Sequence, residues 1–164
     1  MKIKIINYNT LMFEEFKFKC CIGKNGFSKR KTEGDKKTPT GTFDLGPVYY
    51  RSDKFRKLIT KLKIIKIKKY MGWCDDVNFK SKYNKPININ KKIRHEKLYR
   101  NDYKYDLFIP IKYNYKKPIL NKGSCIFIHL TKNYKPTAGC IALNKKDFLI
   151  LIKVINKKTK IQIL

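Results

Sequence analysis

The sequence predicts a mainly β-structured domain that contains one clear helix. Most apolar residues recur with a period of two, the pattern of a strand with one buried face. Only one segment shows the period of about 3.6 that a helix requires. No internal repeat and no linker of biased composition divides the 164 residues. We therefore expect a single domain over residues 1–164, which is long enough to bury a core.

The expected strands are rich in β-branched and aromatic residues, which favour extended structure. They cover residues 2–6, 15–22, 61–67, 106–113, 124–130 and 160–164. Pro110 lies inside one of these runs. Because proline cannot donate a hydrogen bond to a neighbouring strand, we expect a sheet edge or a bulge at that position.

The clear helix runs from Asn144 to about Ile155. Asn144 is a suitable N-cap, and Asp147 stands at the third helical position, where a carboxylate favours a helix start. Four apolar residues then form a core-facing stripe at helical spacing: Phe148, Leu151, Ile152 and Ile155. Residues 52–69 are ambiguous, and their pattern allows a helix at 53–60 before the next strand.

The formal net charge of +28 raises the question of a nucleic-acid partner. Lys outnumbers Arg by 35 to 5 and is spread over nearly the whole chain. Lys, Ile, Asn and Tyr share A/T-rich codons, so genomic composition explains the charge without a ligand. Nucleic-acid binders favour Arg, whose planar fork suits phosphate and guanine. We expect no dedicated nucleic-acid site, and only a weak attraction to anionic polymers at low salt.

No apolar run approaches the ~20 residues that a membrane helix needs, because Lys interrupts each one. We therefore expect no membrane span. The opening residues contain no apolar stretch of ~7 to 15 residues and no small-residue cleavage site, so no secretory signal is visible.

The cysteines are odd in number and contain no CxxC pair, so a disulfide framework is not expected and a thiol with a chemical role is worth seeking. They are Cys20, Cys21, Cys74, Cys125 and Cys140.

The residues most suited to chemistry lie between 123 and 148. A predicted strand ends near His129, and a short loop leads to Thr137-Ala138-Gly139-Cys140. Acyl transfer needs a nucleophile, a base and hydrogen-bond donors for the developing oxyanion. Cys140 can be the nucleophile and His129 the base, since a thiol with a pKa of ~8.5 benefits from a nearby imidazole. The backbone N–H groups of Gly139 and Cys140 can form the oxyanion hole, and glycine permits the close approach this needs.

On the residues alone, two alternatives stay open. Buried Cys and His side chains commonly have only structural roles. A zinc site is the other alternative, because Cys125 and His129 lie four apart on one predicted strand and Cys140 is near in sequence. Three such ligands and a water would form a catalytic zinc site. The lack of any repeated ligand spacing disfavours zinc.

His129 followed after a gap by Thr-x-Gly-Cys resembles the signature of the L,D-transpeptidase (YkuD-like) catalytic domain. Other segments resemble the short branch of that family, whose members mostly lack a signal, in the same order over roughly residues 20–155. They are EGDKKTPTGTF at 33–43, WCDD at 73–76, HEKLY at 95–99, YD at 105–106 and YN at 113–114.

The resemblance implies a mixed β-sandwich or barrel-like domain with few helices. It also implies a cysteine acyltransferase of cell-wall biogenesis and cell shape that acts on peptidoglycan stem peptides. In this family the Cys attacks the carbonyl of the third residue, a diamino acid, and expels the terminal D-alanine. An acceptor amine then resolves the thioester into a cross-link, or water resolves it in an L,D-carboxypeptidase reaction.

By position, the resemblance assigns Cys140 as nucleophile and His129 as general base and later acid, with no metal and no organic cofactor. We expect a monomer whose substrate lies in the cell envelope or periplasm. Because no signal is visible, a cytoplasmic location stays open.

Four residues are candidates for contacting the substrate: Thr137, Trp73, Tyr113 and His95. Trp73 can stack on a substrate or serve as a packing anchor. His95 next to Glu96 can equally be a surface pair. For the loop at 34–41 we favour a structural turn over direct substrate contact.

The sequence departs from the family pattern at two places. Ala138 stands where a His is common, which leaves His129 as the only base in the motif. Residues 141–143 stand where an Arg often follows the Cys, so the substrate carboxylate lacks its usual partner. A lysine can supply a point charge instead, without the bidentate geometry of Arg. The candidates are Lys135, Lys145 and Lys146.

Two further functions remain as alternatives to transpeptidation. One is a cysteine amidase or carboxypeptidase that hydrolyses an acyl-D-amino bond on the same scaffold. The other, from a different class, is a basic polyanion-binding module in which the Cys–His pair is inert.

Overall fold

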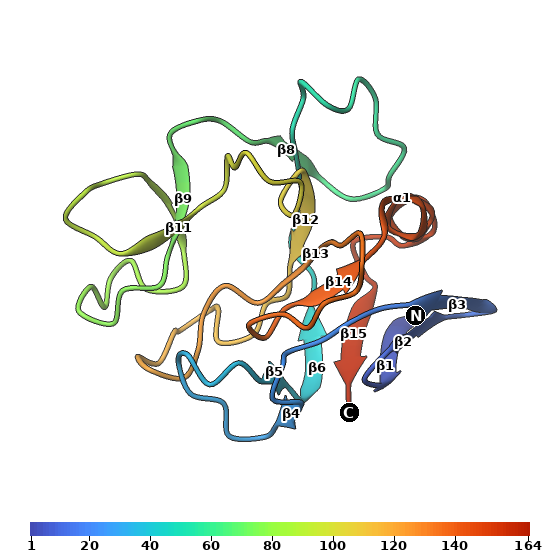
Figure 1. Cartoon of the computed structure of the whole chain (residues 1–164), viewed down its shortest axis with the longest axis horizontal. Coiled ribbons are helices and arrows are strands. Elements are labelled where there is room, and N and C mark those ends of the chain that lie inside the picture. Colours follow the sequence, from blue (N-terminus) through green and yellow to red (C-terminus); the bar gives the residue numbers. More distant parts are fainter.

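The computed structural model describes all residues, 1–164, and its regular secondary structure is mainly β, as predicted (Figure 1). The strands are β1 (Lys2–Asn7), β2 (Thr10–Phe13), β3 (Phe16–Lys19), β4 (Phe27–Ser28), β5 (Thr38–Pro39), β6 (Gly41–Asp44), β7 (Val48–Tyr50), β8 (Ile64–Lys66), β9 (Met71–Cys74), β10 (Pro86–Asn88), β11 (His95–Lys97), β12 (Leu107–Pro110), β13 (Phe127–Leu130), β14 (Ile141–Leu143) and β15 (Lys160–Ile163). The single helix is α1 (Lys145–Val154).

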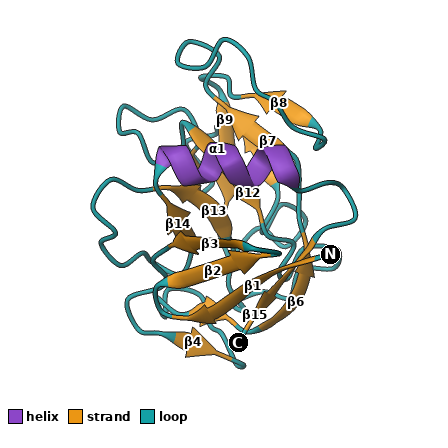
Figure 2. Cartoon of the chain, turned by 90° about the vertical axis from the view of Figure 1, so that its right-hand side faces the viewer, coloured by secondary structure: helices purple, strands orange, loops and turns teal.

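Two five-stranded sheets form the body of the molecule (Figure 2). The first has the strand order β3-β2-β1-β15-β6, and the second has the order β14-β13-β12-β7-β8. A three-stranded sheet, β10-β9-β11, and the pair β4-β5 lie outside them. Neither large sheet closes on itself. The sandwich-like form of the expected fold is therefore present, and the barrel-like form is not.

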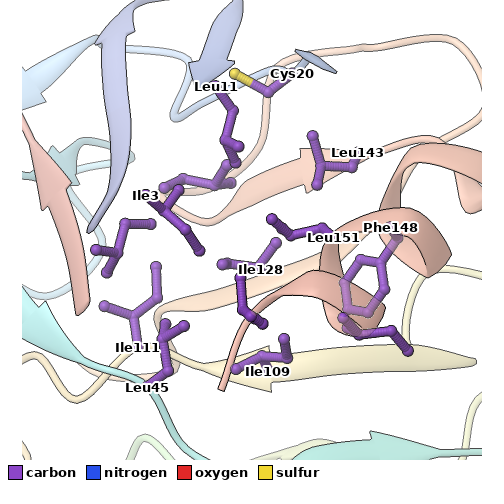
Figure 3. Packing of buried hydrophobic residues seen from close by; sticks show 14 of the residues in the cluster. Ile3, Leu11, Cys20, Leu45, Ile109, Ile111, Ile128, Leu143, Phe148 and Leu151 are labelled. Carbon is purple, nitrogen blue, oxygen red and sulfur yellow. The ribbon is translucent and has the colours of Figure 1, made fainter. Parts of the chain in front are cut away.

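The main core lies between the two large sheets and the helix (Figure 3). The alternation of apolar and Lys residues in β1 turns Ile3 and Ile5 inward, where both are almost fully buried. Ile128 of the second sheet and Leu151 of the helix meet them in the same cluster. The helical stripe packs as predicted, since its four members are fully buried: Phe148, Leu151, Ile152 and Ile155.

The helix start is also confirmed. Asn144 is the N-cap, and its side-chain oxygen accepts a 2.9 Å hydrogen bond from the Asp147 N–H. The helix follows β14 after a single residue, so the cap fixes where the segment carrying Cys140 leaves the sheet. No helix in the structure has the length and apolar character needed to cross a membrane.

The second sheet is buried on both faces at β13. Ile128 and Leu130 belong to the main core, whereas Phe127 belongs to a second cluster on the opposite face. Tyr49 and Phe108 stack there with ring centroids 4.6 Å apart. The members of this second cluster are Tyr49, Ile67, Trp73, Leu98, Tyr105, Phe108, Cys125, Phe127 and Cys140.

Two local predictions need comment. The helix allowed at 53–60 is wrong, because only one turn forms, where Arg51 accepts from the N–H groups of Lys54 and Phe55. Ile59 is 63 % exposed, so no apolar stripe continues that turn. Pro110 lies in a central strand, between residues 107–108, which pair with β7, and Ile111, which pairs with Leu45. The Gly46 N–H still donates to the Pro110 carbonyl oxygen at 2.8 Å, so the proline stands where the register shifts, as at a bulge, and not at an open edge.

Candidate active site

The pairing of β13 with β14 places His129 and Cys140 on the same face of the second sheet. The two strands are parallel, with Ile128 opposite Ile141 and His129 opposite Ala142. Both isoleucines face the main core. Cys140, just before Ile141, and His129, just after Ile128, therefore face the other way. In this register His129 lies opposite Ala142, so Cys140 is its diagonal neighbour, two residues back on the adjacent strand, with an expected separation of ~7 Å.

Both side chains line one cavity of about 510 Å³. This volume is within the usual range for small-molecule sites. Thr137, Ala138 and Ala142 also line it, so the segment around the nucleophile forms one wall. The fold thus brings the predicted nucleophile and base to a single concave site.

The Cys140 thiol is buried and hydrogen-bonded. Its S–H group donates to the Cys125 carbonyl oxygen at 3.1 Å, and the Phe127 N–H donates to its sulfur at 3.4 Å. Burial raises the pKa of Cys140 to about 12. The Cys140 thiol is therefore neutral at pH 7 and would have to lose its proton before it could act as a nucleophile.

The His129 imidazole is oriented by its own strand. Its Nδ1 lies 2.9 Å from the Leu130 carbonyl oxygen. A carbonyl oxygen only accepts, so Nδ1 carries the hydrogen and Nε2 keeps a lone pair. Burial lowers the pKa of His129 to about 4, which keeps the ring neutral at pH 7. The resting site thus combines a neutral thiol with a neutral base.

The turn before Cys140 is fixed by two threonines. The Thr137 hydroxyl accepts from the Gly139 N–H at 3.1 Å and donates to the Cys140 carbonyl oxygen at 2.6 Å. The Thr38 hydroxyl donates to the Gly139 carbonyl oxygen at 2.9 Å. Gly139 has a φ of +134°, and a Cβ there would lie 2.8 Å from the Lys37 carbonyl oxygen, so only glycine fits.

These contacts alter the predicted oxyanion hole. The Gly139 N–H already donates to Thr137, whereas the Cys140 N–H makes no hydrogen bond within the protein. Only the second of the two predicted donors is free to meet an oxyanion. Thr137, predicted as a substrate contact, lines the cavity but uses its hydroxyl to hold the turn.

The loop at 34–41 is more than the structural turn that we favoured. Gly34 and Lys36 line the cavity. Just before the loop, Lys31 also lines it, and its ammonium group bonds the Asp35 carboxylate at 2.5 Å. The side chain of Lys31 is 2 % exposed, so this ion pair neutralises a buried cation beside the nucleophile turn.

Three of the four predicted substrate contacts do not line the cavity. Trp73 is 2 % exposed, and its Nε1–H donates to Asn84 at 3.0 Å, so it is a packing anchor. The Tyr113 hydroxyl donates to the Lys122 carbonyl oxygen, and the ring of His95 bonds the Ile93 carbonyl oxygen. Their polar groups are engaged away from the site.

The polar residues of the cavity wall that the sequence analysis missed include Glu96, Arg100, Lys104 and Tyr105. The ring of Tyr105 lies 5.6 Å from that of His129, and its hydroxyl donates to Glu96 at 2.5 Å. Burial raises the pKa of Glu96. Strand alternation in β11 turns Glu96 to one face and His95 to the other. The sequence analysis did not predict a strand at 95–97, so it could not separate the two residues in this way.

The zinc alternative lacks a ligand set. No three His, Cys, Asp or Glu side chains are grouped so that they could hold a metal ion. Cys125 precedes β13 and has a φ of +54°, so it does not share a continuous strand with His129 as predicted. All five cysteines are free thiols.

Comparison with known families gives one match. The family model of the L,D-transpeptidase catalytic domain (YkuD) matches residues 8–163, a range that includes the whole cavity wall. A search of curated proteins and of solved structures found no match.

Proposed function

Because the chain belongs to the L,D-transpeptidase catalytic-domain family, which acts on peptidoglycan, we propose that it cross-links stem peptides through a thioester on Cys140. The observation that carries this proposal is the placement of Cys140 and His129 on one face of the β13–β14 pair, lining one cavity. A nucleophile beside a base with a free lone pair is what cysteine acyl transfer requires.

The first half-reaction forms the acyl-enzyme. The Cys140 S–H turns from the Cys125 carbonyl oxygen to His129 Nε2, which takes the thiol proton as the sulfur attacks the carbonyl carbon of the third stem residue. The carbonyl oxygen becomes an oxyanion, which the free Cys140 N–H can stabilise. The intermediate collapses to a thioester, and the imidazolium gives its proton to the departing amino group of D-alanine.

The second half-reaction transfers the acyl group. An acceptor amine attacks the thioester, His129 takes a proton from that amine, and the sulfur leaves and recovers a proton from the imidazolium. The products are the cross-linked peptide and the neutral thiol. We place this reaction in the cell envelope, because the substrate polymer of the family lies there.

Intact-mass measurement after mixing with a carbapenem, and separately with a purified disaccharide tetrapeptide, tests the proposal. We expect the adduct mass on the wild type and none on Cys140→Ala. Cys20→Ala is the matched control, since it removes a buried thiol of the main core and should still be labelled. Full labelling of Cys140→Ala would contradict the proposal.

The same samples separate the alternative functions. Cross-linked product that increases with acceptor amine supports transpeptidation. A tripeptide released by hydrolysis at every acceptor concentration indicates a carboxypeptidase or amidase. An unreactive Cys140 together with polyanion binding that weakens steeply with salt indicates a basic binding module.

A further inference from the structure

The segment after the nucleophile cannot recognise a carboxylate. Residues 141–143, where the family often has an Arg, form β14 and are fully buried. Of the three lysines that we considered as substitutes, only Lys135 lines the cavity, and the ammonium group of Lys145 lies over the Phe55 ring. Lys31 is already paired with Asp35. The other cations of the cavity wall are Lys36, Lys104 and Arg100, and among all of these only Arg100 offers the planar fork that suits a carboxylate.

The segment 100–105 runs beside the base. The Lys104 carbonyl oxygen accepts a 3.0 Å hydrogen bond from the N–H of Leu130, the residue after His129. The ring of Tyr105 contacts the His129 ring, and the Arg100 Cζ lies 5.0 Å from the centroid of that same tyrosine ring. Arg100 is the one arginine that lines the cavity.

Arg100 is held in place with part of its guanidinium unused. Its Nε and Nη2 donate to one oxygen of Asp102 at 3.1 and 2.6 Å, and the other oxygen accepts from the Lys104 N–H. The buried Arg51 donates to the Arg100 carbonyl oxygen at 2.7 Å. The Arg100 Nη1 has no partner within the protein, and the side chain is 34 % exposed. Arg100 is therefore a preorganised residue of the cavity wall with a donor still unused.

We propose that Arg100 binds the α-carboxylate of the residue that leaves, so that this site prefers stem peptides with a free C-terminus. The inference rests on the proposed function. His129 must reach the amino nitrogen of the leaving residue, and the carboxylate of that residue is bonded to the same Cα. Arg100 and His129 both lie near the Tyr105 ring, so Arg100 is placed to meet this carboxylate. The groups on the acyl side of the scissile bond lie towards Cys140.

Binding to Cys140→Ala, which cannot form a thioester, tests this role without turnover. The probes are a stem tetrapeptide ending in D-alanine and the same peptide with a C-terminal amide, measured by calorimetry. We expect the acid to bind about 10- to 100-fold more tightly, as a charge-assisted contact implies. In Cys140→Ala/Arg100→Gln this ratio should fall to near one, and Arg100→Lys should keep part of it.

The matched control is Cys140→Ala/Arg56→Gln, which removes one positive charge from an exposed position outside the cavity. It should keep the preference for the acid. Equal binding of acid and amide by Cys140→Ala would overturn the assignment, as would a preference that survives Arg100→Gln or disappears in Arg56→Gln. Acylation of the protein with Cys140 intact tests the proposed function separately, so the two failures are distinguishable.

Discussion

The hydroxyl of Thr38 donates a 2.9 Å hydrogen bond to the carbonyl oxygen of Gly139, across 101 residues of sequence. The same hydroxyl accepts from the Gly23 N–H at 2.9 Å, and Thr38 is fully buried. A threonine in β5 thus connects the turn before the nucleophile to the N-terminal part of the chain, although it has no contact with substrate chemistry.

Thr38→Val should destabilise the protein by about 2 kcal/mol, because it leaves the Gly23 N–H and the Gly139 carbonyl without their buried partner. Carbapenem acylation should also slow, since the turn that carries Cys140 loosens. Urea unfolding and stopped-flow acylation measure the two effects. Thr38→Ser keeps the hydroxyl and should stay close to the wild type in both. Wild-type stability in Thr38→Val would show that the two bonds contribute little.

Asn84→Asp should lower the free energy of unfolding at pH 7 by about 3 kcal/mol. The Asn84 amide donates to the carbonyl oxygens of Tyr113 and Asn114, and its oxygen accepts from Trp73 and Cys125. A carboxylate keeps the acceptor role but places negative charge against two carbonyl oxygens.

Thermal unfolding at neutral and acidic pH checks this prediction, because protonation of the new carboxyl group should reduce the difference from the wild type. The control is Asn88→Asp, an exposed position in the neighbouring strand β10, which should have little effect. An equal loss in both variants would argue against a specific role for Asn84.

Neither Cys140 nor His129 should titrate near neutral pH in the free protein. Burial raises the pKa of Cys140 to about 12 and lowers the pKa of His129 to about 4. The thiolate absorbance of the wild type minus that of Cys140→Ala should therefore stay flat from about pH 5 to about pH 9. A step in that interval would reveal a preformed thiolate–imidazolium pair instead.

Acid should destabilise the wild type more than His129→Gln. The pKa of His129 falls from 6.5 to about 4 on folding, because the ring is buried. Below about pH 6.5 the unfolded chain binds a proton that the folded protein does not, so the free energy of unfolding declines until about pH 4. The full shift corresponds to about 3 kcal/mol.

Denaturant unfolding of both proteins at pH 7 and at pH 4.5 or so measures this difference. The same measurement on His95→Gln shows how much follows from the loss of any histidine. If the wild type and His129→Gln lose equal stability, the His129 ring is protonated in the folded protein.

Local sequence patterns predicted the elements that show a clear periodicity or a helix cap. The alternation in KIKII gave β1, and the cap and stripe gave α1 from Asn144 onward. The single turn at Arg51 was mistaken for a helix because the sequence does not show that Ile59 faces solvent. Short strands such as β7 and β14 depend on pairing with distant strands, which local periodicity cannot indicate.

In the candidate site, too, residues in a local motif were predicted, whereas residues placed by distant contacts were not. Cys140 and His129 were predicted from a motif, and the parallel register of β13 and β14 explains why both line one cavity. The sequence left the role of Trp73 open between substrate stacking and packing, because its burial depends on Phe127, 54 residues later, whose ring lies 5.1 Å away. Arg100 was missed because the sequence does not show that Tyr105 lies near both Arg100 and His129.

The position of β15 has a consequence for how the chain is made. β15 lies between β1 and β6, and residues 2–5 pair with residues 160–163. During synthesis, β1 and β6 therefore emerge long before the strand that joins them, and each exposes an open edge that invites pairing with another chain. Deletion of residues 160–164 should leave those edges open permanently, so that chaperone dependence and inclusion-body formation, more than loss of chemistry, would limit the yield of such a truncated protein.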